Sequence, residues 1–291
     1  MNGTANNIAI LTDSVAQVPK DIANELGIIV IPLSIIVEDQ SFLDGVDITP
    51  ATLYQRMRTE GIFPRTTHPS IGDYIKAFRG SLEEGAQSII YYALSGSLSG
   101  GFSTATKAVA IVQEEFPDRD IEVFDTRMAT IAQGFIVIEA ARVARKGSPL
   151  SKVIDHTKEI QHKVGFAATL ETLDYLDHGG RIGKASYMVG SLLSIKPILS
   201  INEDGVVVPL CRTRGTRKSL KRIVECIGEQ VKGSTVLHLA VMHADALSQA
   251  RELKQLAQST FKPVEIFITD FTPVMAAHTG PGLVGLGYYY E

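Results

Sequence analysis

The sequence predicts an α/β protein with two domains, and three observations carry this prediction. Short apolar runs alternate with helical patterns along the chain, as expected where strands and helices alternate. An Asn-Glu-Asp-Gly stretch at 202–205 separates two apolar runs and predicts an antiparallel hairpin, hence a mixed sheet, in the second half. The 291 residues, 45% hydrophobic and 21% charged, suit one large or two ordinary globular domains with a full core.

The first half contains the patterns of four strands and the helices between them. Helix starts are indicated by Thr49 before Pro50 and by Ser70 three residues before Asp73, because these hydroxyls can cap free backbone N–H groups. Strands are expected at 8–11, 28–36, 88–94 and 121–124, and later helices at 128–146 and 150–162.

The strand pattern restarts at 164–169, and we place the domain boundary just before it. The predicted domains are therefore residues 1–160 and 161–291. The remaining expected elements are hairpin strands at 195–201 and 206–211, strands at 235–242, 264–269 and 283–290, and a helix at 246–260.

Composition excludes several classes of function. A net charge of −4 gives no basic field for nucleic acid, so we expect no nucleic-acid partner. Two cysteines, Cys211 and Cys226, have neither metal-ligand spacing nor the density of a disulfide framework. The apolar run at 28–37 is too short to cross a bilayer, and residues 1–7 lack a signal-peptide pattern. We therefore expect a cytoplasmic protein with no transmembrane segment.

Three polar loops, at 66–70, 94–101 and 277–282, combine hydroxyls, glycines and an imidazole beside apolar runs. Hydroxyls and exposed backbone N–H groups can bind a carboxylate or phosphate without a full counter-charge. The loops therefore predict a receptor for an anion. Residues 95–101 hold three serines and three glycines, more than a tight turn needs.

Other motifs leave alternatives open. Asp13 after the first strand is either a helix cap or a pocket support, and His278 is either fixed near a ligand or purely structural. The stretch 179–184 is similar to a phosphate loop, but Ala185 replaces the hydroxyl that binds magnesium, which leaves Arg181 and Lys184 free to meet an acidic partner. No metal site is expected, because no histidine or carboxylate cluster has metal-ligand spacing.

A serine-dependent hydrolase of acyl esters is the competing hypothesis. Ser95 or Ser97 would be its nucleophile, His278 its base and Asp125 the orienting acid. Against it, Leu98 stands where a nucleophile elbow places its serine.

Taken together, the motifs resemble those of the DegV family, which includes the fatty-acid-binding subunits of bacterial fatty acid kinase. The resemblance spans nearly the whole chain. The segments that carry it are Thr12-Asp13-Ser14, Ile31-Pro32-Leu33, Asp47-Ile48-Thr49, 66–70, 94–101, Gly179-Gly180-Arg181-Ile182, Lys196-Pro197-Ile198 and 277–282.

The resemblance implies two α/β domains, a three-layer one with a parallel sheet and then one with a mixed sheet. It also implies a non-catalytic carrier in phospholipid metabolism, with a long-chain fatty acid in an apolar tunnel and its carboxylate between Thr66, Ser95 and His278. A separate ATP-binding kinase subunit would form the acyl phosphate. No other cofactor is implied. The expected ligand-binding residues are Thr66, Thr67, His68, Ser95, Gly96, Ser97, His278 and Thr279, and the expected partner-binding residues are Arg181 and Lys184.

One departure from the family pattern concerns the first loop. The usual glutamine there is replaced by His68. The sequence leaves open whether His68 contacts the ligand or only packs.

Overall fold

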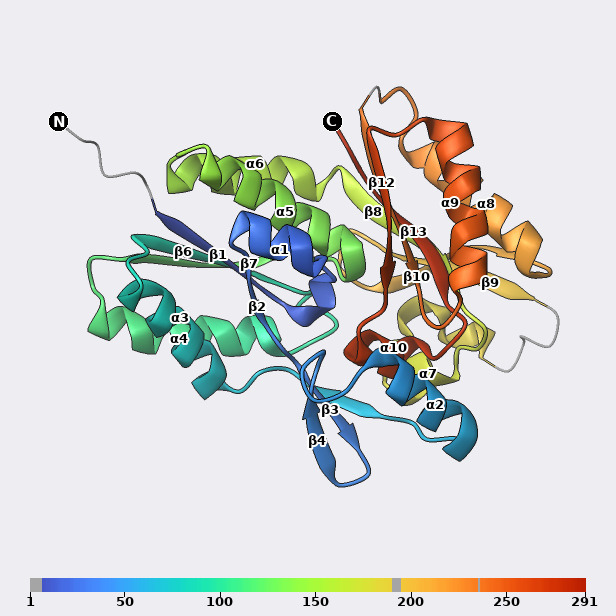
Figure 1. Ribbon diagram of the computed structural model, residues 1–291, viewed down its shortest axis with the longest axis horizontal. Coiled ribbons are helices and arrows are strands. Elements are labelled where there is room, and N and C mark those ends of the chain that lie inside the picture. The colour runs from blue at the N-terminus through green and yellow to red at the C-terminus, as the bar shows by residue number, and fades with distance from the viewer. Residues whose placement is uncertain (1–6, 190–194, 235) are drawn as a thin grey trace.

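The structure, a computed structural model, describes residues 7–189, 195–234 and 236–291 (Figure 1). A parallel sheet in the order β2-β1-β6-β7 forms the centre of the N-terminal half. Helices α1, α5 and α6 lie on one face of this sheet and α3 and α4 on the other (Figure 1). These elements are β1 Ile8–Asp13, α1 Lys20–Leu26, β2 Ile29–Ile31, α3 Ile71–Glu83, β6 Ser88–Ala93, α4 Gly101–Glu115, β7 Asp120–Asp125, α5 Thr130–Arg145 and α6 Leu150–Gln161.

The C-terminal half is built on a mixed sheet in the order β10-β9-β8-β13-β11-β12. Helices α8 and α9 cover its outer face, and α5 of the first half packs against the inner face through β8 and β13. The predicted α/β architecture, parallel sheet first and mixed sheet second, is confirmed. The elements are β8 Val164–Thr169, α7 Asp174–His178, β9 Lys196–Ile201, β10 Val207–Thr213, α8 Thr216–Gln230, β11 Leu237–His243, α9 Leu247–Phe261, β12 Glu265–Asp270, α10 Pro273–Thr279 and β13 Val284–Tyr290.

The prediction of a single strand at 28–36 is wrong. The segment forms two strands of different sheets, which are separated at Pro32 and Leu33. Proline has no N–H to donate to a ladder, so a strand seldom continues through it. The second piece, β3 Ser34–Val37, pairs with β4 Gln40–Leu43 and β5 Arg65–Thr67 in a separate antiparallel sheet. Thr66 and Thr67 therefore lie on a short strand and not in a loop.

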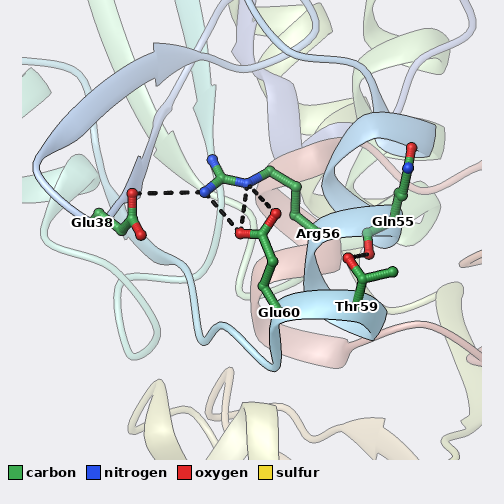
Figure 2. Close-up of polar contacts among 5 residues, drawn as sticks. All are labelled: Glu38, Gln55, Arg56, Thr59 and Glu60. Carbon is green, nitrogen blue, oxygen red and sulfur yellow. Dashed lines mark hydrogen bonds and ion pairs between the residues drawn. The ribbon is translucent and has the colours of Figure 1, made fainter.

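Helix α2, Pro50–Glu60, connects β4 to β5 and packs beside α10. Its Arg56 bonds Glu60 one turn later, with Nη2 2.9 Å from Oε2, and also approaches Glu38 between β3 and β4 (Figure 2). The pair with Glu60 lies within α2, and only the pair with Glu38 connects the helix to the small sheet. Because both carboxylates are exposed, each pair contributes little stability.

The predicted helix caps are confirmed. Thr49 Oγ1 accepts a hydrogen bond from Thr52 N, and Ser70 and Asp73 form a reciprocal capping box at the start of α3. The 3-10 helix after β1, Ser14–Ala16, is likewise capped by the Asp13 carboxylate. Local polar signals thus fixed these boundaries.

The boundary after residue 160 stays a prediction. It falls one residue before the end of α6, with three residues between it and the start of β8. However, the small sheet and α2, which belong to the first half by sequence, contact α10 of the second half. This contact between the halves builds one end of the cavity described below.

Candidate functional site

An apolar cavity of about 360 Å³ lies between the two halves of the chain. Its size is that of a small-molecule site. The first half contributes Val15 and Leu33, and the second half contributes Phe271 and Leu283. The other apolar lining residues are Leu94, Leu98, Ala129, Phe166, Ala168, Leu170, Leu176, Leu199, Ile201, Val207, Val274 and Met275.

A threonine and a histidine form the polar end of this cavity. Thr66 Oγ1 lies 2.7 Å from His278 Nε2, although the residues are 212 positions apart in sequence. Pairing of Thr66 with Ile35 places the hydroxyl on β5, and the last turn of α10 places the imidazole opposite it. Both residues line the cavity, so an anion inside it can reach both groups.

The other imidazole nitrogen of His278 points toward the end of α7. A side chain at Gly179 would bring its Cβ within 2.5 Å of Nδ1, so only glycine leaves room for this ring position. The Nδ1 atom is buried without a hydrogen-bond partner among the described residues.

Burial, together with the nearby charge of Arg181, lowers the pKa of His278 from 6.5 to about 4. The imidazole is therefore neutral at pH 7. A neutral imidazole has one nitrogen that donates and one that accepts, so it can donate to an anion without supplying a positive charge.

We expect this imidazole to titrate near pH 4 in the free protein. Its native pKa lies below its unfolded value, so its contribution to stability is complete above pH 6.5 and is lost as the pH falls toward 4. NMR titration of the ring measures the pKa, and a bound carboxylate should raise it. The variant His278→Asn should lack this part of the acid destabilisation, and a native pKa near 6.5 would contradict the prediction.

Arg181 is the one expected partner-binding residue that the structure brings to the cavity. Its half-buried guanidinium donates from Nε to the Leu98 carbonyl at 2.9 Å and from Nη1 to the Gly179 carbonyl at 2.6 Å. These two bonds hold a full positive charge beside His278, whereas the polar loops alone predicted an anion site without a full counter-charge. Lys184 lies exposed on the following 3-10 helix, Gly183–Met188.

The loop 94–101 faces the hairpin turn between β9 and β10. The fully buried Ser95 hydroxyl donates to the Gly205 carbonyl at 2.8 Å, and Ser97 Oγ donates to the Asp204 carbonyl at 2.8 Å. Gly96 N donates to Asp125 Oδ1 at 3.2 Å. In the structure Ser95 and Ser97 therefore tie the two halves together, whereas the Gly96 bond lies within the first half. The loop lines the cavity through Leu94, Leu98 and Ser99.

A buried carboxylate supports the start of this loop. Asp13 accepts hydrogen bonds from Leu94 N at 2.8 Å and Gln133 Nε2 at 3.2 Å. Burial raises the pKa of Asp13 to about 6. Its hydrogen bonds lower the pKa, but the effect of burial is larger. Asp13 is both a cap and a support for the residues beside the cavity, so both sequence interpretations hold.

The other expected ligand residues line the cavity near the polar pair. His68 Nδ1 is bonded to the Pro69 carbonyl at 2.9 Å, and Thr279 Oγ1 donates to the Met275 carbonyl at 2.9 Å. Thr67 is exposed, since alternate residues of a strand face opposite sides. His68 thus both borders the cavity and bonds locally.

The residues proposed for a hydrolase are not joined into a catalytic chain. His278 Nε2 is bonded to Thr66, and Asp125 Oδ1 accepts from Gly96 N and Arg127 N. Ser95 is bonded to Gly205, as described above. Within the described ranges, no group of three or more histidine, cysteine or acidic side chains could hold a metal ion.

The apolar lining is what sequence reasoning missed. Its residues were recognisable as parts of strands and helices, but which side chains face a cavity depends on how the two halves meet. None of the helices in the described part of the chain has the length and hydrophobicity to span a membrane.

Comparisons with known proteins find relatives along nearly the whole chain. A family model described as "Uncharacterised protein, DegV family" matches residues 7–291. A DegV domain-containing protein of Halalkalibacterium halodurans is 34% identical over 286 residues, 98% of this chain and 99% of the relative.

Solved structures extend the similarity to the fold. A DegV family protein from Thermus thermophilus, described by its fatty acid binding, superposes with a TM-score of 0.91 at 30% identity, covering 98% of this chain and 100% of that one. A stearic acid-binding protein from Eubacterium ventriosum gives a TM-score of 0.90 at 25% identity, covering 98% of both chains.

Proposed function

The chain belongs to the DegV family, and on that premise we propose that it binds a long-chain fatty acid in the cavity between its halves. The observation that carries this proposal is the Thr66–His278 pair, which closes one end of an otherwise apolar cavity. The headgroup lies at this pair, and the hydrocarbon runs along the apolar lining.

The energetics favour such a division. Burial contributes about 0.8 kcal/mol per methylene, so roughly fifteen methylenes offer on the order of 12 kcal/mol before ordering costs. An ionised carboxylate buried without partners would cost several kcal/mol. The Thr66 hydroxyl and the His278 imidazole can donate hydrogen bonds to this carboxylate, and the nearby positive charge of Arg181 favours its ionised form.

The decisive experiment is to extract the purified protein and identify any acyl chain by mass spectrometry. Adding palmitate or stearate to the delipidated protein should raise its melting temperature, because a ligand that binds only the native state stabilises it. Absence of both a co-purified acyl chain and any thermal shift would overturn the proposal.

Ser95 has an indirect role in this proposal. The family resemblance implies that Ser95 contacts the carboxylate, whereas in the structure its hydroxyl donates to the Gly205 carbonyl and accepts from Ser97 N. We propose that Ser95 holds the loop and hairpin together, and so keeps Leu94 and Leu98 on the cavity wall.

Ser95→Ala is therefore expected to lower the free energy of unfolding by about 1–3 kcal/mol, because it leaves the buried Gly205 carbonyl unpaired. Affinity for the fatty acid should fall less than about threefold, because the variant loses no hydrogen bond to the carboxylate. Chemical denaturation and calorimetry separate the two effects. A large loss of affinity with unchanged stability would instead return Ser95 to direct contact with the carboxylate.

We also propose that the protein is a carrier, and that a separate ATP-binding kinase subunit converts the bound carboxylate to an acyl phosphate for phospholipid metabolism. Arg181 beside the headgroup and the exposed Lys184 nearby are suited to meet the phosphates of such a partner.

Lys184→Ala is expected to slow acyl-phosphate formation about tenfold, while fatty-acid affinity stays within about twofold, because the residue is exposed and one exposed charge acts mainly on encounter. Kinase assays with the partner subunit and lipid-binding assays without it provide the two readouts. Lys152→Ala, an exposed lysine on α6, is the matched control. An equal loss of acyl-phosphate formation and of fatty-acid affinity would argue against a partner-binding role for Lys184.

A further inference from the structure

A second cavity of about 330 Å³ adjoins the first. The two cavities share three lining residues, Phe166 on β8 and Ser200 and Ile201 on β9. The second cavity is lined on one side by Met128 of the first half and on another by Ile227 of α8, the helix that covers the outer face of the sheet. It therefore borders elements on both sides of the sheet.

The ladder of paired residues in the mixed sheet is short where the two cavities meet. Strand β8 pairs with β13 through six residue pairs, and β9 pairs with β10 through six, but β8 and β9 pair through only Ala168↔Leu199 and Thr169↔Ile198. Continuing this register would place Phe166 opposite Ile201. The ladder therefore stops at the residues that the cavities share.

This opening lies away from the polar end of the first cavity. Thr169, at the end of β8, pairs with Val284, close in sequence to the end of α10 that carries His278. Phe166 lies three residues back along β8, about 10 Å from Thr169 at the usual strand rise of about 3.3 Å per residue. A chain whose headgroup is at His278 can thus direct its other end toward the opening.

The chemistry of the second cavity suits a methyl end. Its buried lining residues include Cys226 and Ile227 of α8, and half-buried Val208 of β10 lies in the same lining. Its lining also includes the exposed polar residues Arg127, His162, Glu203 and Gln230. The buried apolar residues can hold hydrocarbon, while the exposed polar residues stay hydrated.

We propose that the methyl end of a long acyl chain passes between β8 and β9 into this second cavity, so that the opening at Phe166 sets the chain length that the protein prefers. This inference rests on the proposed fatty-acid binding and adds a subsite to it. Chains that reach past Phe166 gain contact with Val208 and Ile227, and shorter chains end in the first cavity.

The first test blocks the second cavity alone. Val208→Trp fills it from a half-buried position, and Val264→Trp, at a 62% exposed site in neither lining, is the matched control. Calorimetry with myristate, palmitate, stearate and arachidate measures the effect. Arachidate should bind Val208→Trp about tenfold more weakly than it binds the unmodified protein, because about two methylenes would stay exposed to water. The affinity for myristate should be unchanged. An unchanged ratio of arachidate to myristate affinity would overturn the inference.

The second test locates the methyl end directly. A stearate analogue with a photoreactive diazirine at its terminal carbon should cross-link peptides that contain Val208 or Ile227. Cross-links confined to first-cavity residues such as Val15 and Leu33 would refute the subsite while leaving fatty-acid binding intact. If no fatty acid of any length binds, the proposed function fails, and the subsite fails with it.

Discussion

Replacement of His278 by leucine is expected to lower the affinity for a long-chain fatty acid by about tenfold to a hundredfold. A hydrogen bond to a charged group contributes about 1.5–3 kcal/mol. Leucine is similar in size to histidine but has neither ring nitrogen, so the variant loses this hydrogen bond. The apolar lining is unchanged, so binding should weaken without being abolished. Calorimetry on the delipidated variant measures the effect.

Thr66→Val should produce a loss of the same order, because valine is nearly isosteric with threonine but has no hydroxyl. Since Thr66 Oγ1 and His278 Nε2 bond one another at 2.7 Å, the double variant should lose less than the sum of the two single losses. Thr260→Val makes the same chemical change at an exposed position of α9 that lines neither cavity, and no loss of affinity is expected there. Equal losses at Thr66 and Thr260 would contradict the assigned headgroup site.

Gly280→Ala is expected to reduce both stability and binding, because Gly280 ends α10 with φ +68° and ψ 171°, a conformation open essentially only to glycine. A Cβ there would also lie 2.3 Å from Cδ2 of the Tyr175 ring. The combined strain and overlap should lower the free energy of unfolding by about 3 kcal/mol or more. The displaced α10 would carry His278 away from Thr66, so affinity should fall as well.

The matched control is Gly147→Ala, after α5. Gly147 has φ +76°, but its Cβ would meet nothing within 4 Å. Strain alone should therefore cost about 1–2 kcal/mol there and leave ligand affinity unchanged. Urea denaturation and calorimetry on both variants separate the two contributions, and equal destabilisation at the two sites would show that the Tyr175 contact relaxes freely.

Some of the fold and the site could be predicted because their causes are local. The capping hydroxyls of Thr49 and Ser70 act within four residues, and the turn at 202–205 joins adjacent strands, so both are legible in a short stretch of sequence. The resemblance of the loops to the DegV family likewise identified Thr66 and His278, which the fold brings together.

The sequence by itself determined the alternation of elements, the caps, the hairpin and the membership of a family. Tertiary structure alone decided that residues 28–36 divide between two sheets, that the Ser95 hydroxyl faces Gly205 and that Arg181 lines the cavity. The physical reason is that periodicity and capping depend on neighbours a few residues away. The direction of a side chain and the lining of a cavity depend instead on packing between segments up to 212 residues apart, as for Thr66 and His278.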